Sequence, residues 1–350
     1  MQRNAFVLLT GQDDNVGDVV LRRRFLRALA DGAKTHVYVR TSSPGFVESL
    51  THGLDVEIYR DRNEWARKCL TGVLRRGWVY AHNPGEIQCR FNLTRWNIPL
   101  IPLFAFARLR GNKVFSIGMG TRDDTKPWRY LWSAVARLSN VTIWRDSWSS
   151  QVFGTGETGP DWAFDERLEE VALGQERGTL LLSYRFDRAS PSADFVAAVR
   201  RVANARGLRP VVLSQVLRDN APAKALADRL GCDAIVWEDG VSHLDHELIV
   251  RRAMAESEAC ISDRIHVLIM GLTEGSIPIG LMEHEDIKAG RHFVAAGMEG
   301  VSANATGWTS DQMSGFLEQR LDQPREEQEA LWKRAASEVA SYTGRMFPNG

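Results

Sequence analysis

The sequence predicts an α/β protein made of two Rossmann-like domains, and three observations support this fold class. The chain has 350 residues, which is more than one typical domain. Strand-like runs alternate with helical patterns from the N-terminus onward, as in parallel βαβ units. After a turn-rich stretch, Gly154–Pro160, a second alternating series begins.

The first series contains enough elements for a complete doubly wound domain, which we assign to residues 1–165. Runs rich in β-branched and aromatic residues predict strands, and the amphipathic stretches between them predict helices. The predicted strands are Ala5–Thr10, His36–Arg40, Val56–Tyr59, Trp78–Ala81, Lys113–Ile117 and Val141–Trp144. The predicted helices are Asp18–Ala30, Pro44–His52, Asn63–Leu74, Leu103–Arg110 and Trp128–Leu138.

The second series predicts another Rossmann-like domain over residues 175–322. Its predicted strands are Thr179–Ser183, Pro210–Leu213, Ala234–Trp237, Ala259–Ser262 and Ile277–Leu281. Its predicted helices are Ala193–Ala205, Ala221–Leu230, Asp245–Glu256, Arg264–Thr273, Ile287–Ala296 and Asp311–Leu321. A last amphipathic segment, Glu326–Tyr342, predicts a long helix. We expect this helix, over residues 325–346, to pack back across both domains and to join the first.

The composition is that of an ordinary globular protein, with 44% hydrophobic and 25% charged residues. The apolar run Ala5–Leu9 is too short for a signal peptide, and Ile98–Ala107 is too short to span a bilayer. We therefore expect a cytoplasmic protein. Four widely spaced cysteines predict buried thiols without disulfides or structural zinc, and we identify no metal site. The sequence leaves open whether the protein forms a homo-oligomer.

Charge is divided unevenly along the chain. Residues 1–150 carry 23 Lys and Arg against 13 Asp and Glu, whereas the remainder carries 21 against 31. A basic half suits an anionic membrane surface or acceptor, and two differently solvated surfaces are the alternative. Peripheral membrane contact through Arg22–Arg24 and the cluster of Arg67, Lys68, Arg75 and Arg76 is one hypothesis. Nucleic acid is not expected, because no binding motif is present.

Three motifs stand at the ends of predicted strands. A helix is predicted after two of them, and a serine-rich turn is predicted after the third. The strongest is Ser262-Asp-Arg-Ile-His266, in which a buried strand runs into a helix whose N-terminus favours anions. The second, Gly11–Asp18, has glycines that permit close backbone approach. The third is Arg145-Asp-Ser-Trp-Ser149, whose arginine can bind carboxylate or phosphate with its planar fork. Each also has a purely structural interpretation as a helix cap or an internal ion pair.

Together the three motifs resemble those of the polysaccharide pyruvyl transferase family. That family pairs an Asn-x-Gly-Asp turn, a mid-chain Arg-[Asp/Glu]-x-x-Ser segment and a Ser-Asp-Arg-x-His motif. Here they stand as Asn15–Asp18, Arg145–Ser149 and Ser262–His266, and Lys288 follows the strand Ser276–Leu281. The resemblance implies a fold similar to the two-domain GT-B glycosyltransferases, with the active site in a cleft between the domains.

The resemblance implies a transferase of cell-envelope or exopolysaccharide biosynthesis that moves a pyruvyl group from phosphoenolpyruvate to a saccharide, forming a ketal without a cofactor. The saccharide acceptor can be lipid-linked or nucleotide-linked. His266 is the candidate acid, with Arg264 and Asp18 as further catalytic residues. The candidate donor-binding residues are Arg145, Arg264, Asn15, Gly17, Ser262 and Lys288.

Two other functions remain open at this point. Because fold does not determine function, the same architecture suits a GT-B-type glycosyltransferase that uses a nucleotide-sugar. A noncatalytic saccharide-binding protein, in which Arg264 and His266 are structural, is the other alternative.

Overall fold

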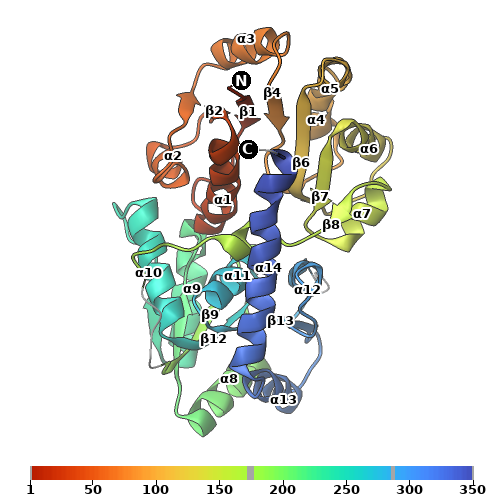
Figure 1. Cartoon of the computed structure of the whole chain (residues 1–350). Helices are drawn as coiled ribbons and strands as arrows, with labels where there is room; N and C mark the ends of the chain where they lie inside the picture. Colours follow the sequence, from red (N-terminus) through yellow and green to blue (C-terminus); the bar gives the residue numbers. More distant parts are fainter. Residues whose placement is uncertain (1, 172–176, 285–287, 349–350) are drawn as a thin grey trace. The chain divides into compact units, whose positions relative to one another are not determined.

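The computed structural model describes residues 2–171, 177–284 and 288–348, and these divide into two compact units (Figure 1). Unit 1 comprises residues 1–13, 18–162 and 337–350, and unit 2 comprises residues 14–17 and 163–336. The long C-terminal helix α14 (Arg325–Met346) is therefore shared, since its residues up to Ala336 belong to unit 2 and the rest to unit 1.

Unit 1 contains an eight-stranded parallel sheet. In spatial order the strands are β3 (Glu57–Tyr59), β2 (Lys34–Tyr38), β1 (Asn4–Leu8), β4 (Trp78–Ala81), β6 (Lys113–Thr121), β7 (Val141–Trp144) and β8 (Glu157–Thr158), and β5 (Gly85–Ile87) pairs with β6. The helices are α1 (Val16–Gly32), α2 (Pro44–Leu50), α3 (Arg62–Gly72), α4 (Phe91–Thr94), α5 (Leu100–Leu109), α6 (Trp128–Leu138) and α7 (Ser147–Phe153). The 3-10 turn η1 (Arg95–Asn97) belongs to unit 1, and the 3-10 turn η2 (Trp162–Asp165) spans its boundary with unit 2.

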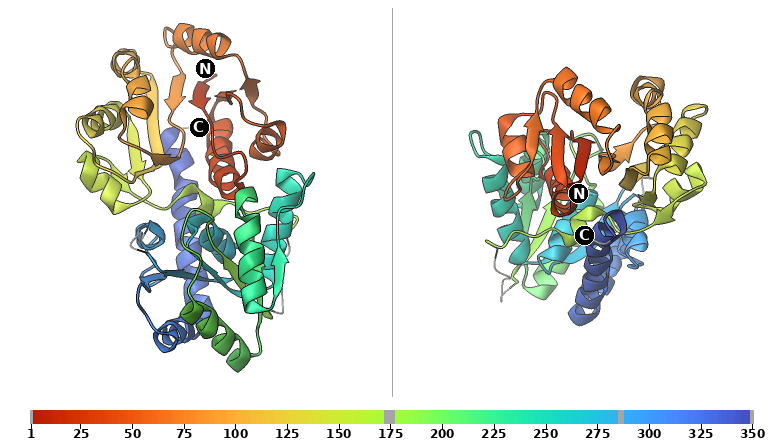
Figure 2. Two further views of the ribbon diagram at one scale, coloured as in Figure 1. Left: turned by 180° about the vertical axis from the view of Figure 1, so that it is seen from behind. Right: turned by 45° about the horizontal axis from the view of Figure 1, so that its top comes forward.

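Unit 2 contains a six-stranded parallel sheet. Its spatial order is β11 (Asp233–Ile235), β10 (Arg209–Leu213), β9 (Thr179–Ser183), β12 (Ser257–Ser262), β13 (Ile277–Met282) and β14 (Ser302–Asn304). The helices are α8 (Ala193–Arg206), α9 (Asn220–Leu230), α10 (His243–Ala255), α11 (Ile265–Thr273), α12 (Lys288–Ala295) and α13 (Ser310–Leu321), with the 3-10 turn η3 (Leu217–Asp219). Figure 2 shows each sheet with helices on either side.

Each unit has its own core. The core of unit 1 is aromatic, and Phe6, Trp65 and Trp78 lie in contact in it. The core of unit 2 is aliphatic and is formed by β9, β10, β12 and β13 with α8, α9 and α13. Two separate cores in two parallel sheets confirm the predicted fold class of two Rossmann-like domains.

The unit boundaries differ from the predicted domains in three places. Residues 14–17, at the start of α1, belong to unit 2. The central segment of unit 1 ends at Trp162, whereas the predicted domain ends at residue 165. The first half of the C-terminal helix belongs to unit 2, although we assigned the helix to the first domain. The predicted start of the second domain, residue 175, lies outside the described residues.

One predicted turn is a helix. The segment after Arg145 was expected to be a serine-rich turn, but residues 147–153 form α7. Asp146 is its N-cap, and its carboxylate accepts hydrogen bonds from the backbone N–H and the hydroxyl of Ser149. Gly154, in the left-handed conformation, ends the helix.

Candidate functional site

The strand order of unit 2 reverses between β9 and β12. From β9 the chain adds β10 and β11 on one side and then β12, β13 and β14 on the other. In open parallel sheets ligands bind outside the carboxyl ends of the strands at such a point. The residues at the carboxyl ends of β9 and β12 are therefore candidates for a ligand-binding site.

Two serines meet at this point. Ser183 ends β9 and Ser262 ends β12, and the two are paired in the ladder. The Ser262 hydroxyl donates to the carbonyl of Ser183 at 2.5 Å and accepts from the backbone N–H of Arg264 at 2.9 Å. The Ser183 side chain is 1% exposed, and its Oγ has no hydrogen-bond partner among the described residues.

The Ser262–His266 motif turns from β12 into α11. Arg264 is the N-cap residue of α11, and its own side chain makes no capping hydrogen bond. Because the first-turn N–H groups of a helix lack partners within it, this N-terminus favours an anion. The Ser262 hydroxyl accepts the backbone N–H of Arg264, the residue just before the first turn.

Arg264 forms a buried ion pair with Asp219. The Asp219 Oδ2 accepts from Arg264 Nε at 2.6 Å and lies 2.5 Å from Nη2 of the same arginine, while Oδ1 accepts from the backbone N–H of Phe186 at 3.0 Å. Burial raises the pKa of the Asp219 carboxyl and lowers the pKa of the Arg264 guanidinium. This pair ties η3, the end of β9 and the start of α11 together.

A second pair of titratable groups lies at the ends of β12 and β13. The Asp263 side chain is 1% exposed, and its Oδ2 lies 3.7 Å from Nε2 of His284. Asp263 Oδ1 has no hydrogen-bond partner among the described residues. A carboxylate beside an imidazole can take up and pass on a proton.

The second predicted motif contributes residues 14–17 to unit 2. Asn15 forms an antiparallel bridge with Val216, and its Oδ1 accepts from the Gly17 N–H at 3.0 Å. Gly17 lies so close to α11 that a Cβ added there would be 2.2 Å from Gln215 Nε2 and 2.6 Å from the Cβ of His266. Asn15, Gly17 and His266 therefore lie together within unit 2.

Two predicted site residues belong to unit 1. Asp18 accepts the backbone N–H of Gln12 at 2.7 Å and pairs with Arg22 at 3.3 Å. Arg145, predicted to bind the donor, is 5% exposed, and its NH1 lies 3.2 Å from Oδ2 of the fully buried Asp161. Lys288 begins α12 in unit 2.

Sequence reasoning missed Ser183, Gln215, Asp219 and His284 as site residues. Gln215 follows β10 and is 1% exposed, and its Oε1 has no partner among the described residues. Ser183 and His284 were detectable, because each stands at the carboxyl end of a predicted strand or just beyond it. Nothing in the sequence indicates that Asp219, 45 residues before Arg264, pairs with it.

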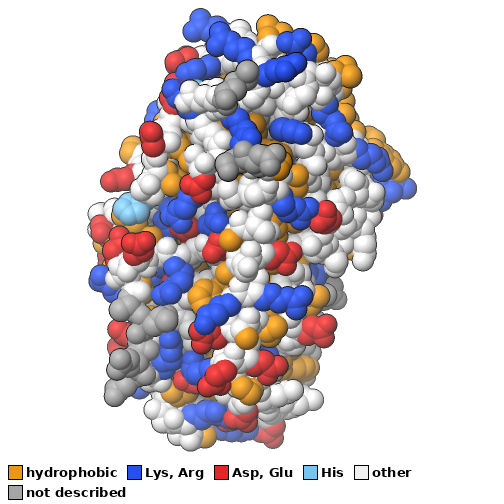
Figure 3. Space-filling view, viewed as in Figure 1, with side chains coloured by type: hydrophobic (Ala, Val, Ile, Leu, Met, Phe, Trp, Pro, Cys, Tyr) orange, Lys and Arg blue, Asp and Glu red, His pale blue; other side chains and the backbone are white. Residues whose placement is uncertain are grey.

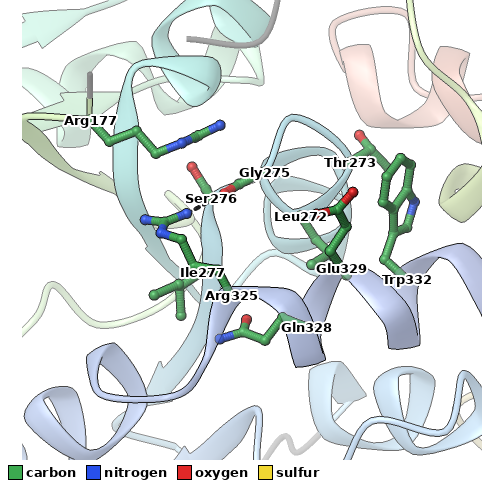
Figure 4. Close-up of a pocket in the computed structure, with 10 residues that line it drawn as sticks. All are labelled: Arg177, Leu272, Thr273, Gly275, Ser276, Ile277, Arg325, Gln328, Glu329 and Trp332. Carbon is green, nitrogen blue, oxygen red and sulfur yellow. Dashed lines mark hydrogen bonds between the residues drawn. The ribbon is translucent and has the colours of Figure 1, made fainter. Parts of the chain in front are cut away.

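A pocket in unit 2 lies at the opposite edge of the sheet, at the start of β13 and the end of α11 (Figure 4). Arg177 and Arg325 point into this region. Arg177 donates to the carbonyls of Ser257 and Glu274, and Arg325 to that of Gly275. These arginines hold helix and strand ends, so we interpret the pocket as structural.

Neither a metal centre nor a membrane span is found in the described part of the chain. Within residues 2–171, 177–284 and 288–348, no group of three or more His, Cys, Asp or Glu side chains could hold a metal ion. Over the same ranges, the helices are too short or too polar to cross a membrane.

Comparison with known protein families finds no match, and no curated protein matches in sequence. The resemblance to the polysaccharide pyruvyl transferase family therefore stays a prediction.

Solved structures do match. One is the UDP-GlcNAc 2-epimerase from Neisseria meningitidis bound to UDP-GlcNAc, with a TM-score of 0.57, 11% identity, and coverage of 97% of this chain and 99% of that one. Another is the UDP-GlcNAc 2-epimerase from Methanocaldococcus jannaschii, with a TM-score of 0.56, 10% identity, and coverage of 97% of this chain and 99% of that one. A third is the glycotransferase of kitacinnamycin, with a TM-score of 0.54, 10% identity, and coverage of 99% of this chain and 100% of that one.

These structures correct the predicted function. The proteins of similar fold are nucleotide-sugar epimerases and a glycotransferase, which contradicts pyruvyl transfer from phosphoenolpyruvate and favours the nucleotide-sugar alternative. The proposed phosphoenolpyruvate ligands Arg145 and Arg264 also each have a buried carboxylate partner, Asp161 and Asp219. At this low identity the likeness extends to the fold alone, so the chain has the two-domain, Rossmann-like architecture similar to that of GT-B enzymes.

Proposed function

We propose that this protein is a glycosyltransferase that takes a nucleotide-sugar as donor and a saccharide as acceptor. One observation carries the proposal. Where the strand order of unit 2 reverses, Ser183 and Asp263 each present a buried oxygen with no partner among the described residues, beside the N-terminus of α11. Buried polar atoms without partners are rare and suit a polar ligand. The nucleotide-sugar enzymes of similar fold supply the ligand class.

The donor's diphosphate lies at the N-terminus of α11 in this proposal. The first-turn N–H groups and the helix dipole attract the phosphate oxygens. The Ser183 hydroxyl, which has a proton to donate, contributes a hydrogen bond. Arg264 acts as a positioning residue, because its ion pair with Asp219 fixes the turn that leads from β12 into α11.

Transfer then needs a base for the acceptor. An acceptor hydroxyl attacks the anomeric carbon of the donor sugar, the bond to the phosphate oxygen breaks, and the nucleoside diphosphate leaves with the electron pair. The hydroxyl proton passes to the Asp263 carboxylate, which His284 supports from 3.7 Å. His266, predicted as an acid, lies in the first turn of α11.

Ligand binding is the first test. Isothermal titration of the whole chain with UDP, UDP-GlcNAc and a guanine nucleotide-sugar should give saturable binding of at least one of them, whereas phosphoenolpyruvate should not bind. Binding of the native state by a ligand also raises the melting temperature by mass action. Failure of every nucleotide-sugar and nucleotide to bind would refute the proposal.

Variants locate the site. Ser183→Ala should weaken nucleotide binding by roughly 10- to 150-fold, since a hydrogen bond to a charged group contributes about 1.5–3 kcal/mol. Arg325→Lys, at the opposite edge of the sheet, is the matched control and should leave affinity unchanged. Equal effects of the two variants would place binding elsewhere.

Product analysis separates the remaining functions. With donor and a panel of saccharides, a transferase releases nucleoside diphosphate only when an acceptor is present. An epimerase converts the donor alone, and a noncatalytic binding protein does neither. Asp263→Asn should lower turnover by about 10²–10⁴-fold while donor affinity changes little, as expected for a general base.

A further inference from the structure

The exposed side of α5 is apolar, which is unusual for a surface helix. From Ile98 to Ala107 the sequence has no charged or polar side chain. One side of the helix is buried in the core of unit 1 through Phe104 and Ala107. The other side is exposed, with Phe106 at 40% and Leu109 at 88%. An ordinary surface helix would carry polar residues on that side.

The exposed apolar side chains continue before the helix. Phe91 in α4 is 50% exposed and Ile98 is 49% exposed, and Pro102 is exposed between Ile98 and Phe106. The spacing of Ile98, Pro102, Phe106 and Leu109 puts them on one side of α5. We call Phe91, Ile98, Pro102, Phe106 and Leu109 the α5 patch. Its helical part is about 15 Å long.

Positive charge surrounds the α5 patch. From Ile87 to Arg122 the chain contains no Asp or Glu. In the same stretch, and in or just before the neighbouring α6, basic side chains are exposed or partly exposed: Arg90, Arg95, Arg108, Arg110, Lys113, Lys126 and Arg129. In Figure 3, blue and orange side chains occur together at the upper right, where Figure 1 shows α5 and α6.

Some of these cations also have structural roles. Arg108 donates to the carbonyls at the end of α6, and Arg110 donates to the carbonyl of Leu74. Arg129 pairs with Asp124 at 3.6 Å. Carbonyls do not neutralise a guanidinium, and Arg90, Lys113 and Lys126 are exposed as well. Even with Asp123 and Asp124 counted, the net charge around the α5 patch therefore remains positive.

We propose that the α5 patch docks unit 1 onto the surface of an anionic phospholipid bilayer. Apolar side chains ringed by Lys and Arg fit a membrane interface, where the apolar groups enter the acyl boundary and the cations face the headgroups. A second copy of the chain fits less well, because a symmetric contact would bring like charges together. The α5 patch differs from the two basic groups expected from sequence. Arg22, Arg23 and Arg24 are buried, and the exposed Arg67, Lys68, Arg75 and Arg76 lie in or just after α3.

Vesicle sedimentation of the full chain tests the proposal. Binding should be strong to vesicles of equal parts phosphatidylcholine and phosphatidylglycerol and weak to phosphatidylcholine alone, and it should fall as salt is raised. The double variant Phe106→Ser, Leu109→Ser should lower the partition coefficient more than tenfold, given the apolar area removed. Lys113→Gln should lower it roughly fivefold.

Matched controls keep the test specific. The double variant Ile249→Ser, Val294→Ser removes exposed apolar side chains from unit 2 and should leave binding unchanged. Circular dichroism melting checks that each variant folds. Absence of binding to anionic vesicles, or equal binding by the Phe106/Leu109 variant, overturns the proposal. The proposal is also overturned if light scattering shows a concentration-dependent dimer that only the Phe106/Leu109 variant abolishes. The α5 patch would then join two copies of the chain.

Discussion

Arg264 and Asp219 form an ion pair in which Oδ2 of the carboxylate lies 2.6 Å from Nε of the guanidinium. The Asp219 side chain is 1% exposed and that of Arg264 12% exposed. The two residues come from different strand ends, since Asp219 follows β10 and Arg264 follows β12. Arg264, which the sequence predicts to bind the donor, therefore connects two loops at the candidate site.

Breaking this pair should destabilise unit 2. Asp219→Ala removes the partner of Arg264 and the acceptor of the Phe186 N–H, and we expect a loss of about 3–5 kcal/mol in the free energy of unfolding. The double variant Asp219→Ala, Arg264→Met should be less destabilised than Asp219→Ala alone, because no buried charge remains unpaired. Urea unfolding measures both. Additive effects of the two substitutions would show that the residues are not coupled.

Gly17 tests whether residues 14–17 pack tightly within unit 2. Gly17→Ala places a Cβ 2.2 Å from Gln215 Nε2 and 2.6 Å from His266 Cβ, so something must move. We expect a loss of about 1–3 kcal/mol. Gly315→Ala, in α13, meets no atom within 4 Å and should stabilise by about 0.5–1 kcal/mol. If Gly17→Ala changes the melting temperature as Gly315→Ala does, the packing around Gly17 is looser than the structure shows.

Most of the fold could be predicted from the sequence, because alternating strand and helix patterns are local. Trp78–Ala81, Trp128–Leu138 and Thr179–Ser183 were predicted with the bounds that the structure has. Short elements were missed, among them β5 and β8, because two or three residues carry no periodicity. The serine-rich start of α7 was read as a turn, since serine is frequent both in turns and at helix starts.

The candidate site was only partly predictable. The residues of Ser262–His266 were found because their strand and helix are adjacent in sequence. The partners Asp219 and Asp161 were not, because an ion pair between distant residues depends on strand order. The excess of basic residues in the first half was seen, but the exposure of Leu109 and the burial of Arg23 depend on which side of a helix meets the core.

A buried charge cluster in unit 2 should make Arg251 essential for stability. Its Nε donates to Glu247 at 2.8 Å and its NH1 to Glu274 at 2.6 Å, and all three side chains are fully buried. Arg251→Ala leaves two buried carboxylates without this guanidinium, and we expect a loss of at least 3–5 kcal/mol. Arg201→Ala breaks an exposed pair with Asp311 and should cost less than about 1 kcal/mol in urea unfolding. Similar losses in the free energy of unfolding for Arg251→Ala and Arg201→Ala would contradict a stabilising role of the buried Arg251 cluster.

His82 should make unit 1 sensitive to acid. Its ring follows β4 and lies among aromatic rings, with centroids 5.2 Å from Tyr80, 5.4 Å from Phe104 and 6.0 Å from Trp132. Its Nε2 has no partner among the described residues. Burial lowers the pKa of His82 from 6.5 to about 4. The neutral imidazole is therefore the form that the folded state favours.

The direction of the pH effect follows from proton binding. Between pH 6.5 and about 4 the unfolded chain binds the proton and the folded chain does not, so the free energy of unfolding falls as the pH is lowered through this range. The fall due to His82 reaches about 3 kcal/mol at most. His82→Phe should flatten the curve of stability against pH in urea unfolding. Phe104→Leu, which alters the same cluster without a titrating group, should shift the curve without changing its slope. Parallel curves for the wild type and His82→Phe would mean that His82 does not titrate in this range.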